Sequence, residues 1–273
     1  MKDTLLNRLL VNVLGIPGIL LLIWLGDIYF AVFIILVTLI AIWEYYSINE
    51  LKGAKPVKWI GMLATILIGI LYYQGAMQIQ TITSGIIILV IVVMLVEMYR
   101  GLPDPTKTIA ITLFGIFYIP FLLGTLIALR NWDSEVGTHL TLAVFVSVWV
   151  CDSFAYLFGK KWGKSKMLER VSPNKTVVGC ISGVFGALLV YSIFQLTGYL
   201  GMPFDWLDIV ILALITGIFG QAGDFAESMI KRDMGVKDSG TMLQAHGGVF
   251  DRFDSLFFTG SLTYVYVYLV LGI

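Results

Sequence analysis

The charged stretch at residues 228–254 reads SMIKRDMGVKDSGTMLQAHGGVFDRFD, and apolar segments that could cross a membrane lie on both sides of it. Of the 273 residues in the chain, 58% are hydrophobic and 13% are charged. Soluble domains usually have about 25% charged residues, so this composition indicates a polytopic membrane protein. A polar cluster between membrane segments is energetically costly, and residues 228–254 are therefore interpreted first as a functional site.

Nine apolar segments are expected to form transmembrane helices, because a helix of roughly 20 residues spans a bilayer. They predict an all-α polytopic membrane protein. A very short turn around Gly26 and Asp27 joins the first two segments. Cys151 and Cys180 fall inside apolar segments and are interpreted as packing residues, not as a disulfide or a metal pair. The nine segments are residues 10–26, 28–48, 58–76, 84–99, 108–129, 138–158, 177–200, 207–230 and 255–273.

The distribution of basic residues predicts the orientation of these segments. If the N-terminus is cytoplasmic, every Lys and Arg except Arg130 falls on the cytoplasmic side. This asymmetry predicts a cytoplasmic N-terminus and a C-terminus on the outside. It also puts residues 228–254 and the basic connection 159–176 in the cytoplasm. By composition alone, that connection also fits a loop that contacts anionic lipid headgroups.

Polar residues near the end of the eighth segment share one helix face. Asp224, Glu227, Ser228 and Lys231 are three or four residues apart, which is the spacing of neighbours on a helix surface. Glu227 is expected to form an ion pair with Lys231, one turn further on. That pair does not account for Asp224, which is interpreted as a metal ligand or a partnered, proton-carrying acid.

Asp251 and Asp254 lie where the ninth segment begins. Each could simply cap that helix or interact favourably with its dipole. Together with Asp224 they also offer hard oxygen ligands of the kind that Mg²⁺ prefers. The cations available for phosphate groups are Lys231, Arg232, Lys237 and Arg252.

Two further features leave alternatives open. His246 is followed by Gly247 and Gly248, which would allow close backbone approach to a phosphate but also fit an ordinary turn. Asp152, inside the sixth segment, suits either a hydrogen bond to a neighbouring helix or the same metal and phosphate centre. No Walker loop, nucleophile triad or nucleic-acid signature is found in the sequence.

Residues 228–254 closely resemble the signature of the phosphatidate cytidylyltransferases, also called CDP-diacylglycerol synthases. That signature runs S-x-apolar-K-R, four residues, K-D-x-G/S/A, two residues, an apolar residue, P/G-x-H-G-G, an apolar residue, x-D-R-apolar-D. Gln244 departs from it, because Pro or Gly is usual there. The matching residues are Ser228, Lys231, Arg232, Lys237, Asp238, Gly240, Leu243, His246, Gly247, Gly248, Val249, Asp251, Arg252, Phe253 and Asp254.

The resemblance extends upstream, over roughly the C-terminal half of the chain. Residues 152–163, DSFAYLFGKKWG, resemble the family motif D-x-x-A-Y-x-x-G. Residues 172–179, SPNKTVVG, resemble S-P-x-K-T/S-x-E-G, with Val178 in place of the usual Glu. The chain is accordingly expected to have N-terminal transmembrane helices over residues 1–135. A transmembrane catalytic region over 136–273 would follow, with cytoplasmic loops 159–176 and 231–254.

The resemblance implies a reaction in phospholipid biosynthesis: CTP and phosphatidate give CDP-diacylglycerol and pyrophosphate with Mg²⁺. A second, monovalent cation is left open. The implied partners are CTP and phosphatidate from the bilayer, without nucleic acid, and a homodimer is a family expectation. The implied location is a bacterial-type inner membrane, with the active site facing the cytoplasm.

The implied site residues fall into three groups. Catalytic residues would be Asp224, Asp251, Lys237, Asp238 and His246. Metal ligands would be Asp224, Asp251, Asp254 and Asp152. Substrate-binding residues would be Ser172, Asn174, Lys175, Thr176, Ser228, Lys231, Arg232, Gly247, Gly248 and Arg252.

Three alternatives are carried forward. A transporter or channel also fits many spans with acids inside them, although transporters usually place such acids at repeat interfaces and no repeat is visible. A related CTP-dependent enzyme could act on another lipid. A non-catalytic family member would fit the departures at Val178 and Gln244.

Overall fold

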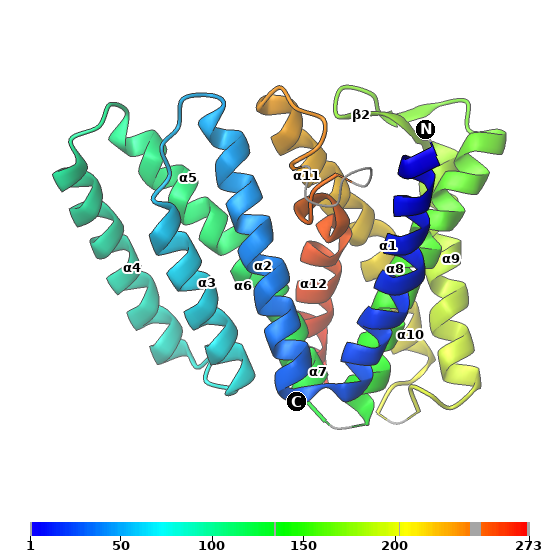
Figure 1. Ribbon diagram of the computed structural model, residues 1–273. Coiled ribbons are helices and arrows are strands. Elements are labelled where there is room, and N and C mark those ends of the chain that lie inside the picture. The colour runs from blue at the N-terminus through cyan, green and yellow to red at the C-terminus, as the bar shows by residue number, and fades with distance from the viewer. Residues whose placement is uncertain (1, 134, 202, 241–246, 272–273) are drawn as a thin grey trace. The chain divides into compact units, whose positions relative to one another are not determined.

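The computed structural model describes residues 2–133, 135–201, 203–240 and 247–271, with side chains from residue 14 onward. It is an all-α fold apart from one short β-hairpin (Figure 1). Every predicted apolar segment coincides with a helix or a succession of helices. The chain forms two compact units. Unit 1 comprises Met1–Ala128 and Met234–Phe250, and unit 2 comprises Leu129–Asp233 and Asp251–Ile273.

Six helical stretches of the described chain are long and apolar enough to cross a membrane, which makes this a helical membrane protein. Shorter apolar helices cover Leu14–Leu25 and Lys58–Tyr73, and the helix Asp254–Val270 has 17 residues. The nine spans and the orientation of the termini therefore stay predictions. The six stretches are Asp27–Glu50, Ile79–Arg100, Pro105–Asn131, Val136–Trp162, Val177–Leu196 and Trp206–Asp233.

Unit 1 is a set of helices packed around α2 and α5. Its elements are α1 (Lys2–Leu25), α2 (Asp27–Glu50), α3 (Lys58–Tyr73), α4 (Ile79–Arg100), α5 (Pro105–Tyr118), α6 (Pro120–Leu123) and the first part of α7 (Thr125–Asn131). Helix α5 contacts α2, α3 and α4, and α2 packs along α3 (Figure 1). The turn between α1 and α2 is as short as predicted, with positive φ angles at Gly26 and Asp27.

Tyr46 of α2 is the centre of the packing in unit 1. Its ring is fully buried, and its hydroxyl donates a hydrogen bond of 2.8 Å to the carbonyl oxygen of Thr112 on α5. Gly61 of α3 and Gly115 of α5 make room for the ring, because a Cβ at either position would lie within 2.7 Å of its atoms. Small residues thus let three apolar helices approach closely, as is common in membrane proteins.

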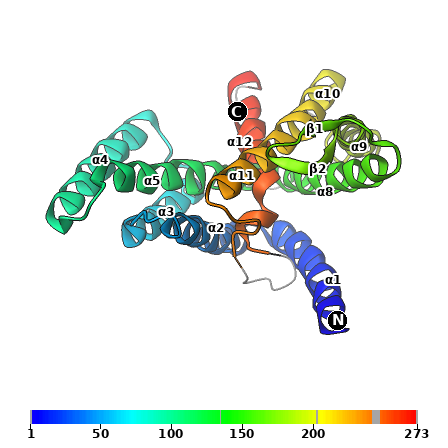
Figure 2. The same cartoon turned by 90° about the horizontal axis from the view of Figure 1, so that it is seen from above.

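Unit 2 holds the remaining elements. They are α8 (Val136–Trp162), β1 (Lys166–Leu168), β2 (Ser172–Thr176), α9 (Val177–Leu196), α10 (Trp206–Leu214), a π-helical segment (Ile215–Gly220), α11 (Gln221–Asp233) and α12 (Asp254–Val270). Helices α8 and α9 form the most extensive helix pair of the unit, and the hairpin lies against both of them and α11 (Figure 2). Gly183 of α9 allows this packing, because a Cβ there would lie 2.9 Å from the sulfur of Cys151.

Three expectations from sequence differ in detail from the structure. The connection 159–176 is not a simple loop, because α8 continues to Trp162 and residues 166–176 form an antiparallel hairpin in which Lys166 pairs with Thr176. The fifth segment is broken before Pro120, which has no backbone N–H to continue the helix. The eighth segment contains the π-helical segment 215–220 between α10 and α11.

Candidate active site

The two upstream motifs meet in one pocket of unit 2. Asp152, Tyr156 and Gly159 follow one face of α8, since they are spaced by four and three residues. Strand β2 and the first turn of α9 lie opposite this face, and α11 closes the pocket with Gln221 and Asp224. The volume of the pocket is about 520 Å³. Its polar lining consists of Asp152, Tyr156, Lys160, Lys166, Asn174, Lys175, Thr176, Gln221 and Asp224.

Lys175 and Asp224 form an ion pair within this pocket. Lys175 comes from β2 and Asp224 from the first turn of α11, so tertiary structure joins two segments that are far apart in the sequence. The ammonium also lies 4.6 Å from the centre of the Phe225 ring. The Ser228 hydroxyl lies 3.4 Å from the other carboxylate oxygen of Asp224, one turn along the helix. Both charged side chains stay partly exposed, at 28% and 21%, so a ligand in the pocket can reach them.

Asp152 and Asp254 belong to the same electrostatic cluster as Asp224. The carboxylate of each interacts with that of Asp224 and also with the ammonium of Lys175. Helix α12 approaches α11 closely here, because a Cβ at Gly223 would lie 2.8 Å from the carbonyl oxygen of Asp254. Asp224 pairs with Lys175, and Asp152 and Asp254 lie within electrostatic range of both. This excess of negative charge favours the arrival of further positive charge.

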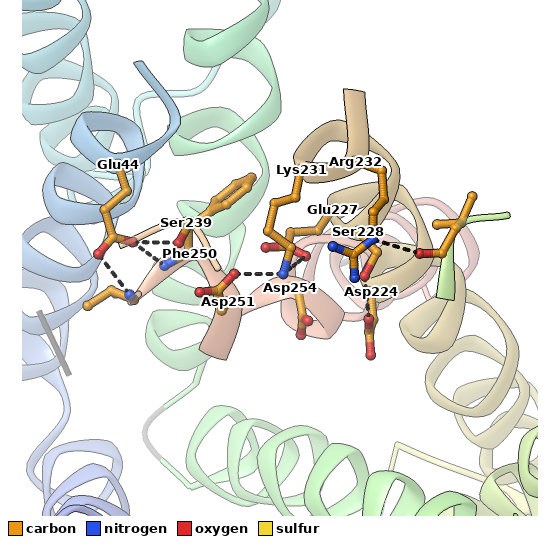
Figure 3. Close-up of polar contacts among 12 residues, drawn as sticks. Glu44, Asp224, Glu227, Ser228, Lys231, Arg232, Ser239, Phe250, Asp251 and Asp254 are labelled. Carbon is orange, nitrogen blue, oxygen red and sulfur yellow. Dashed lines mark hydrogen bonds and ion pairs between the residues drawn. The ribbon is translucent and has the colours of Figure 1, made fainter. Parts of the chain in front are cut away.

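Asp251 lies in a second cluster, with Glu227 and Lys231 of α11. Lys231 is buried and its ammonium lies 2.7 Å from Asp251 and 2.8 Å from Glu227 (Figure 3). The Glu227 side chain is fully buried. The predicted ion pair between Glu227 and Lys231 is thus confirmed. The charge of Lys231 is already engaged by two carboxylates, so its predicted phosphate contact stays a prediction.

The described residues contain no group of three His, Cys, Asp or Glu side chains close enough to hold a metal ion by themselves. Mg²⁺ does not require one, because it usually binds through one or two carboxylates, water and substrate phosphates. The oxygen donors of Asp152, Asp224 and Asp254 are of the type it prefers, and their shared negative charge suits a divalent cation. The residues therefore fit Mg²⁺, with Asp251 as a member of the neighbouring cluster.

Arg232 lines a different pocket of unit 2. Its Nε donates to the carbonyl oxygen of Val171 at 3.4 Å, just before β2. Arg170, Val171, Met229, Ile230, Arg232 and Asp233 line this second pocket, whose volume is about 470 Å³. Ser172 is half-buried in β2, and the exposed Arg252 acts electrostatically on Asp152. Sequence alone does not separate Arg232 from Arg252, because both belong to one signature.

The remaining part of the signature belongs to unit 1. Lys237 and Asp238 are exposed, whereas Gly247 and Gly248 are buried. His246, Leu243 and Gln244 lie outside the described residues. Ser239, Val249 and Phe250 each donate a hydrogen bond to Glu44 of α2 (Figure 3). Glu44 is not among the residues predicted from sequence, although an acid in an apolar segment is itself a signal of function.

Val178 and the two cysteines can be placed in the structure. Val178 is half-buried in the first turn of α9. The hydroxyl of Thr176 caps this helix by accepting a hydrogen bond of 3.2 Å from the Gly179 amide.

Gln221 also lines the first pocket, although nothing in the sequence singles it out. Its side chain donates a hydrogen bond of 2.9 Å to the carbonyl oxygen of Cys180. Cys151 and Cys180 are free thiols, as expected.

Fold and site together define an integral membrane protein of helices whose polar pocket carries carboxylates and lysines suited to phosphate groups. The model of the cytidylyltransferase family matches residues 6–270. Three similar proteins are phosphatidate cytidylyltransferases. That of Bacillus subtilis is 35% identical, with 94% of this chain and 96% of the relative covered. That of Synechocystis sp. is 31% identical, with 98% of both covered, and that of Staphylococcus aureus is 32% identical, with 85% and 87% covered.

This chain therefore belongs to the cytidylyltransferase family and is a nucleotidyltransferase. The match covers nearly the whole chain, including the N-terminal helices for which the motifs give no information. It favours the enzyme over the transporter or channel that the apolar composition left open.

Proposed function

We propose that this protein transfers the cytidylyl group of CTP to phosphatidate, which gives CDP-diacylglycerol and pyrophosphate. A phosphate oxygen of the lipid attacks the α-phosphorus of CTP, and the bond between that phosphorus and the bridging oxygen to the β-phosphate breaks. Pyrophosphate leaves with that oxygen. The observation that carries the proposal is that two family motifs and Asp224 of α11 line one pocket, in which Lys175 pairs with Asp224. The names of the relatives support the choice of substrates.

The pocket has the size and charge for a nucleotide. Its volume falls within the roughly 300–1,000 Å³ that is common for small-molecule sites. In the proposed complex, Lys175 turns from Asp224 to a triphosphate oxygen, and Lys160 and Lys166 add positive charge. Asn174 and Thr176 offer hydrogen bonds. Phosphate transfer depends mainly on positioning and charge stabilisation, and these residues supply both.

Mg²⁺ would be held by Asp224 with Asp152 and Asp254, and Asp251 would be a further ligand. The bound ion supplies charge neutralisation between two anionic reactants. The carboxylates of this chain would hold that charge beside the triphosphate. A second, monovalent cation remains part of the proposal without assigned ligands.

The proposal includes the arrangement in the membrane. Nine spans, a cytoplasmic N-terminus and an outside C-terminus follow from the distribution of Lys and Arg. The pocket then opens at the cytoplasmic face of a bacterial inner membrane, where CTP arrives from water and phosphatidate from the bilayer. A homodimer is expected from the family.

Two radioactive forms of CTP test the reaction. Purified protein in detergent with phosphatidate and Mg²⁺ should move label from [α-³²P]CTP into lipid, whereas [γ-³²P]CTP should yield labelled pyrophosphate and unlabelled lipid. The reverse pattern would identify a lipid kinase. Absence of both products with phosphatidate and other phosphorylated lipids would refute the enzyme assignment.

Variants of two acids on α11 test the pocket. Asp224→Asn should lower lipid labelling at least about a hundredfold, as loss of a charge-stabilising group does in other enzymes. Asp233→Asn is the matched control, because the exposed Asp233 lies on the same helix outside the first pocket. Equal turnover of the two variants would sink the assignment of Asp224. Asp251→Asn is expected to behave like Asp224→Asn.

A further inference from the structure

Glu44 of α2 binds the signature segment of unit 1 through three hydrogen bonds. Its Oε1 accepts from the Val249 amide at 3.1 Å. Its Oε2 accepts from the Phe250 amide at 2.8 Å and from the Ser239 hydroxyl at 3.1 Å. Glu44 is 6% exposed and lies in a helix whose other residues are mostly apolar. A buried acid of this kind persists only where its oxygens are satisfied.

The geometry requires a carboxylate specifically. Each of the two oxygens faces a backbone N–H, and only Asp and Glu carry two acceptor oxygens without a donor. Glutamine has nearly the same shape, but its NH₂ group would face one of the two amide donors. Aspartate has the right chemistry but is one methylene shorter. The residue type at position 44 is therefore restricted by the hydrogen bonds that its side chain must accept, rather than by apolar packing.

Two glycines of the signature also lie against this carboxylate. A Cβ at Gly240 would lie 2.5 Å from Glu44 Oε1, and a Cβ at Gly248 would lie 2.4 Å from Oε2 and 2.2 Å from the Ser239 hydroxyl. Neither glycine has a positive φ angle, so the backbone itself would accept a side chain. Glu44 thus explains why glycine stands at both positions: the backbone at Gly240 and at Gly248 lies close to its carboxylate.

We propose that Glu44 is a positioning residue for cytidylyl transfer. Its carboxylate joins Ser239 to Val249 and Phe250, and so holds two parts of the signature together. Lys237 and Asp238 precede one anchor in the chain, and Asp251 directly follows the other. Glu44 acts through this segment and touches no substrate. The inference deepens the proposed function and rests on it.

Hydrogen–deuterium exchange tests the hydrogen bonds directly in the full-length protein. In Glu44→Gln, the peptide containing Val249 and Phe250 should exchange at least about tenfold faster, because hydrogen bonds to charged groups are worth roughly 1.5–3 kcal/mol. Peptides of α8 and α9 should keep their wild-type exchange rates. Lipid labelling from [α-³²P]CTP should fall at least tenfold in the same sample. Glu50→Gln is the matched control, because Glu50 is on the same helix but pairs with Lys58.

Each result decides the question. Normal exchange at Val249 and Phe250, or faster exchange with normal turnover, would overturn the inference. Faster exchange throughout the protein would also overturn it, since Glu44 would then support general stability only. If Glu44→Gln does not fold, Ser239→Ala decides in its place, with a smaller local effect and a several-fold loss of turnover expected. Unchanged turnover in Ser239→Ala would then refute the inference.

The role of Glu44 and the proposed function can be refuted independently of each other. A wild-type protein that labels no lipid refutes the proposed function, whereas the exchange rates still report on Glu44. A coupling measurement adds a second readout. Gly248→Ala should harm turnover less when Glu44 is already alanine, because one of the two side chains that the new Cβ would meet has been removed. Equal losses in both backgrounds would contradict the close packing of Gly248 against Glu44.

Discussion

Lys231 is held between two acids, and its removal should destabilise unit 2. Its ammonium lies 2.7 Å from Asp251 and 2.8 Å from Glu227, whose side chains are 6% and 0% exposed. Lys231→Met would leave two buried carboxylates without their cation, which typically costs about 3–5 kcal/mol. We expect a corresponding loss in the free energy of unfolding in mixed detergent micelles. Lys231→Met/Glu227→Gln should recover part of it.

The pair of Lys58 and Glu50 provides a control of the same chemistry. The distance is also 2.8 Å, but the side chains are 20% and 44% exposed. Exposed pairs contribute about 0–1 kcal/mol, so Lys58→Met should change stability far less than Lys231→Met does. Similar losses in the two variants would show that burial does not set the strength of the Lys231 cluster.

Single residues differ in how far sequence predicts their partners. Glu227 and Lys231 are one helical turn apart, so their pairing follows from helix geometry alone. Asp224 finds its partner Lys175 far away in the sequence, and helical spacing carries no information about such a contact. The hydrogen bonds of Glu44 to Val249 and Phe250 span most of the chain and are equally hidden. In the sequence, these hydrogen bonds are indicated only by the presence of an acidic residue, Glu44, inside an apolar segment.

At the scale of elements, Gly179 controls how closely α9 approaches α8. A Cβ at this position would lie 2.7 Å from the carbonyl oxygen of Ala155 and 3.1 Å from the Thr176 hydroxyl. A backbone carbonyl cannot move without its helix, so Gly179→Ala should push the two helices apart beside the pocket. Such overpacking costs about 1–3 kcal/mol. We expect a lower melting temperature and a more than tenfold loss of lipid labelling.

Gly85 of α4 is the control for this substitution. It is exposed, and a Cβ there would meet nothing within 4 Å. Gly85→Ala should leave turnover unchanged and stability equal or slightly higher, because alanine favours a helix. If Gly179→Ala behaves like Gly85→Ala, the contact between α8 and α9 does not shape the pocket.

The elements themselves were largely predictable because their apolar runs are long. Breaks inside these helices are harder to predict from sequence, although Pro120 is a local signal for the division between α5 and α6. The π-helical segment 215–220 has no comparable signal. The hairpin 166–176 was expected to be a loop, since its strands are short and mostly exposed and therefore lack the apolar alternation that identifies a strand.

At the scale of the whole molecule, sequence and structure answer different questions. The structure has helices at all nine predicted segments, but only the sequence asymmetry of Lys and Arg indicates which ends face the cytoplasm. The two ends of α4 illustrate this. Gln78 precedes the helix and is predicted outside, whereas Arg100 ends it and is predicted inside. A single missing span would reverse every later assignment, so two well-chosen positions test whether the number of crossings between them is odd, as well as the orientation.

Cysteine labelling tests this topology with two exposed positions, Gln78 and Lys164. In a Cys151→Ala/Cys180→Ala background, Gln78→Cys should react with a membrane-impermeant maleimide on intact bacterial spheroplasts. Lys164→Cys lies between α8 and β1, next to the pocket, and should react only after the membrane is opened. Three predicted segments, 84–99, 108–129 and 138–158, lie between these positions. An odd number of crossings puts the two positions on opposite sides of the membrane, so labelling of both in intact spheroplasts would contradict the proposed arrangement. Labelling of Lys164→Cys alone would reverse it and would place the pocket where cytoplasmic CTP cannot reach it.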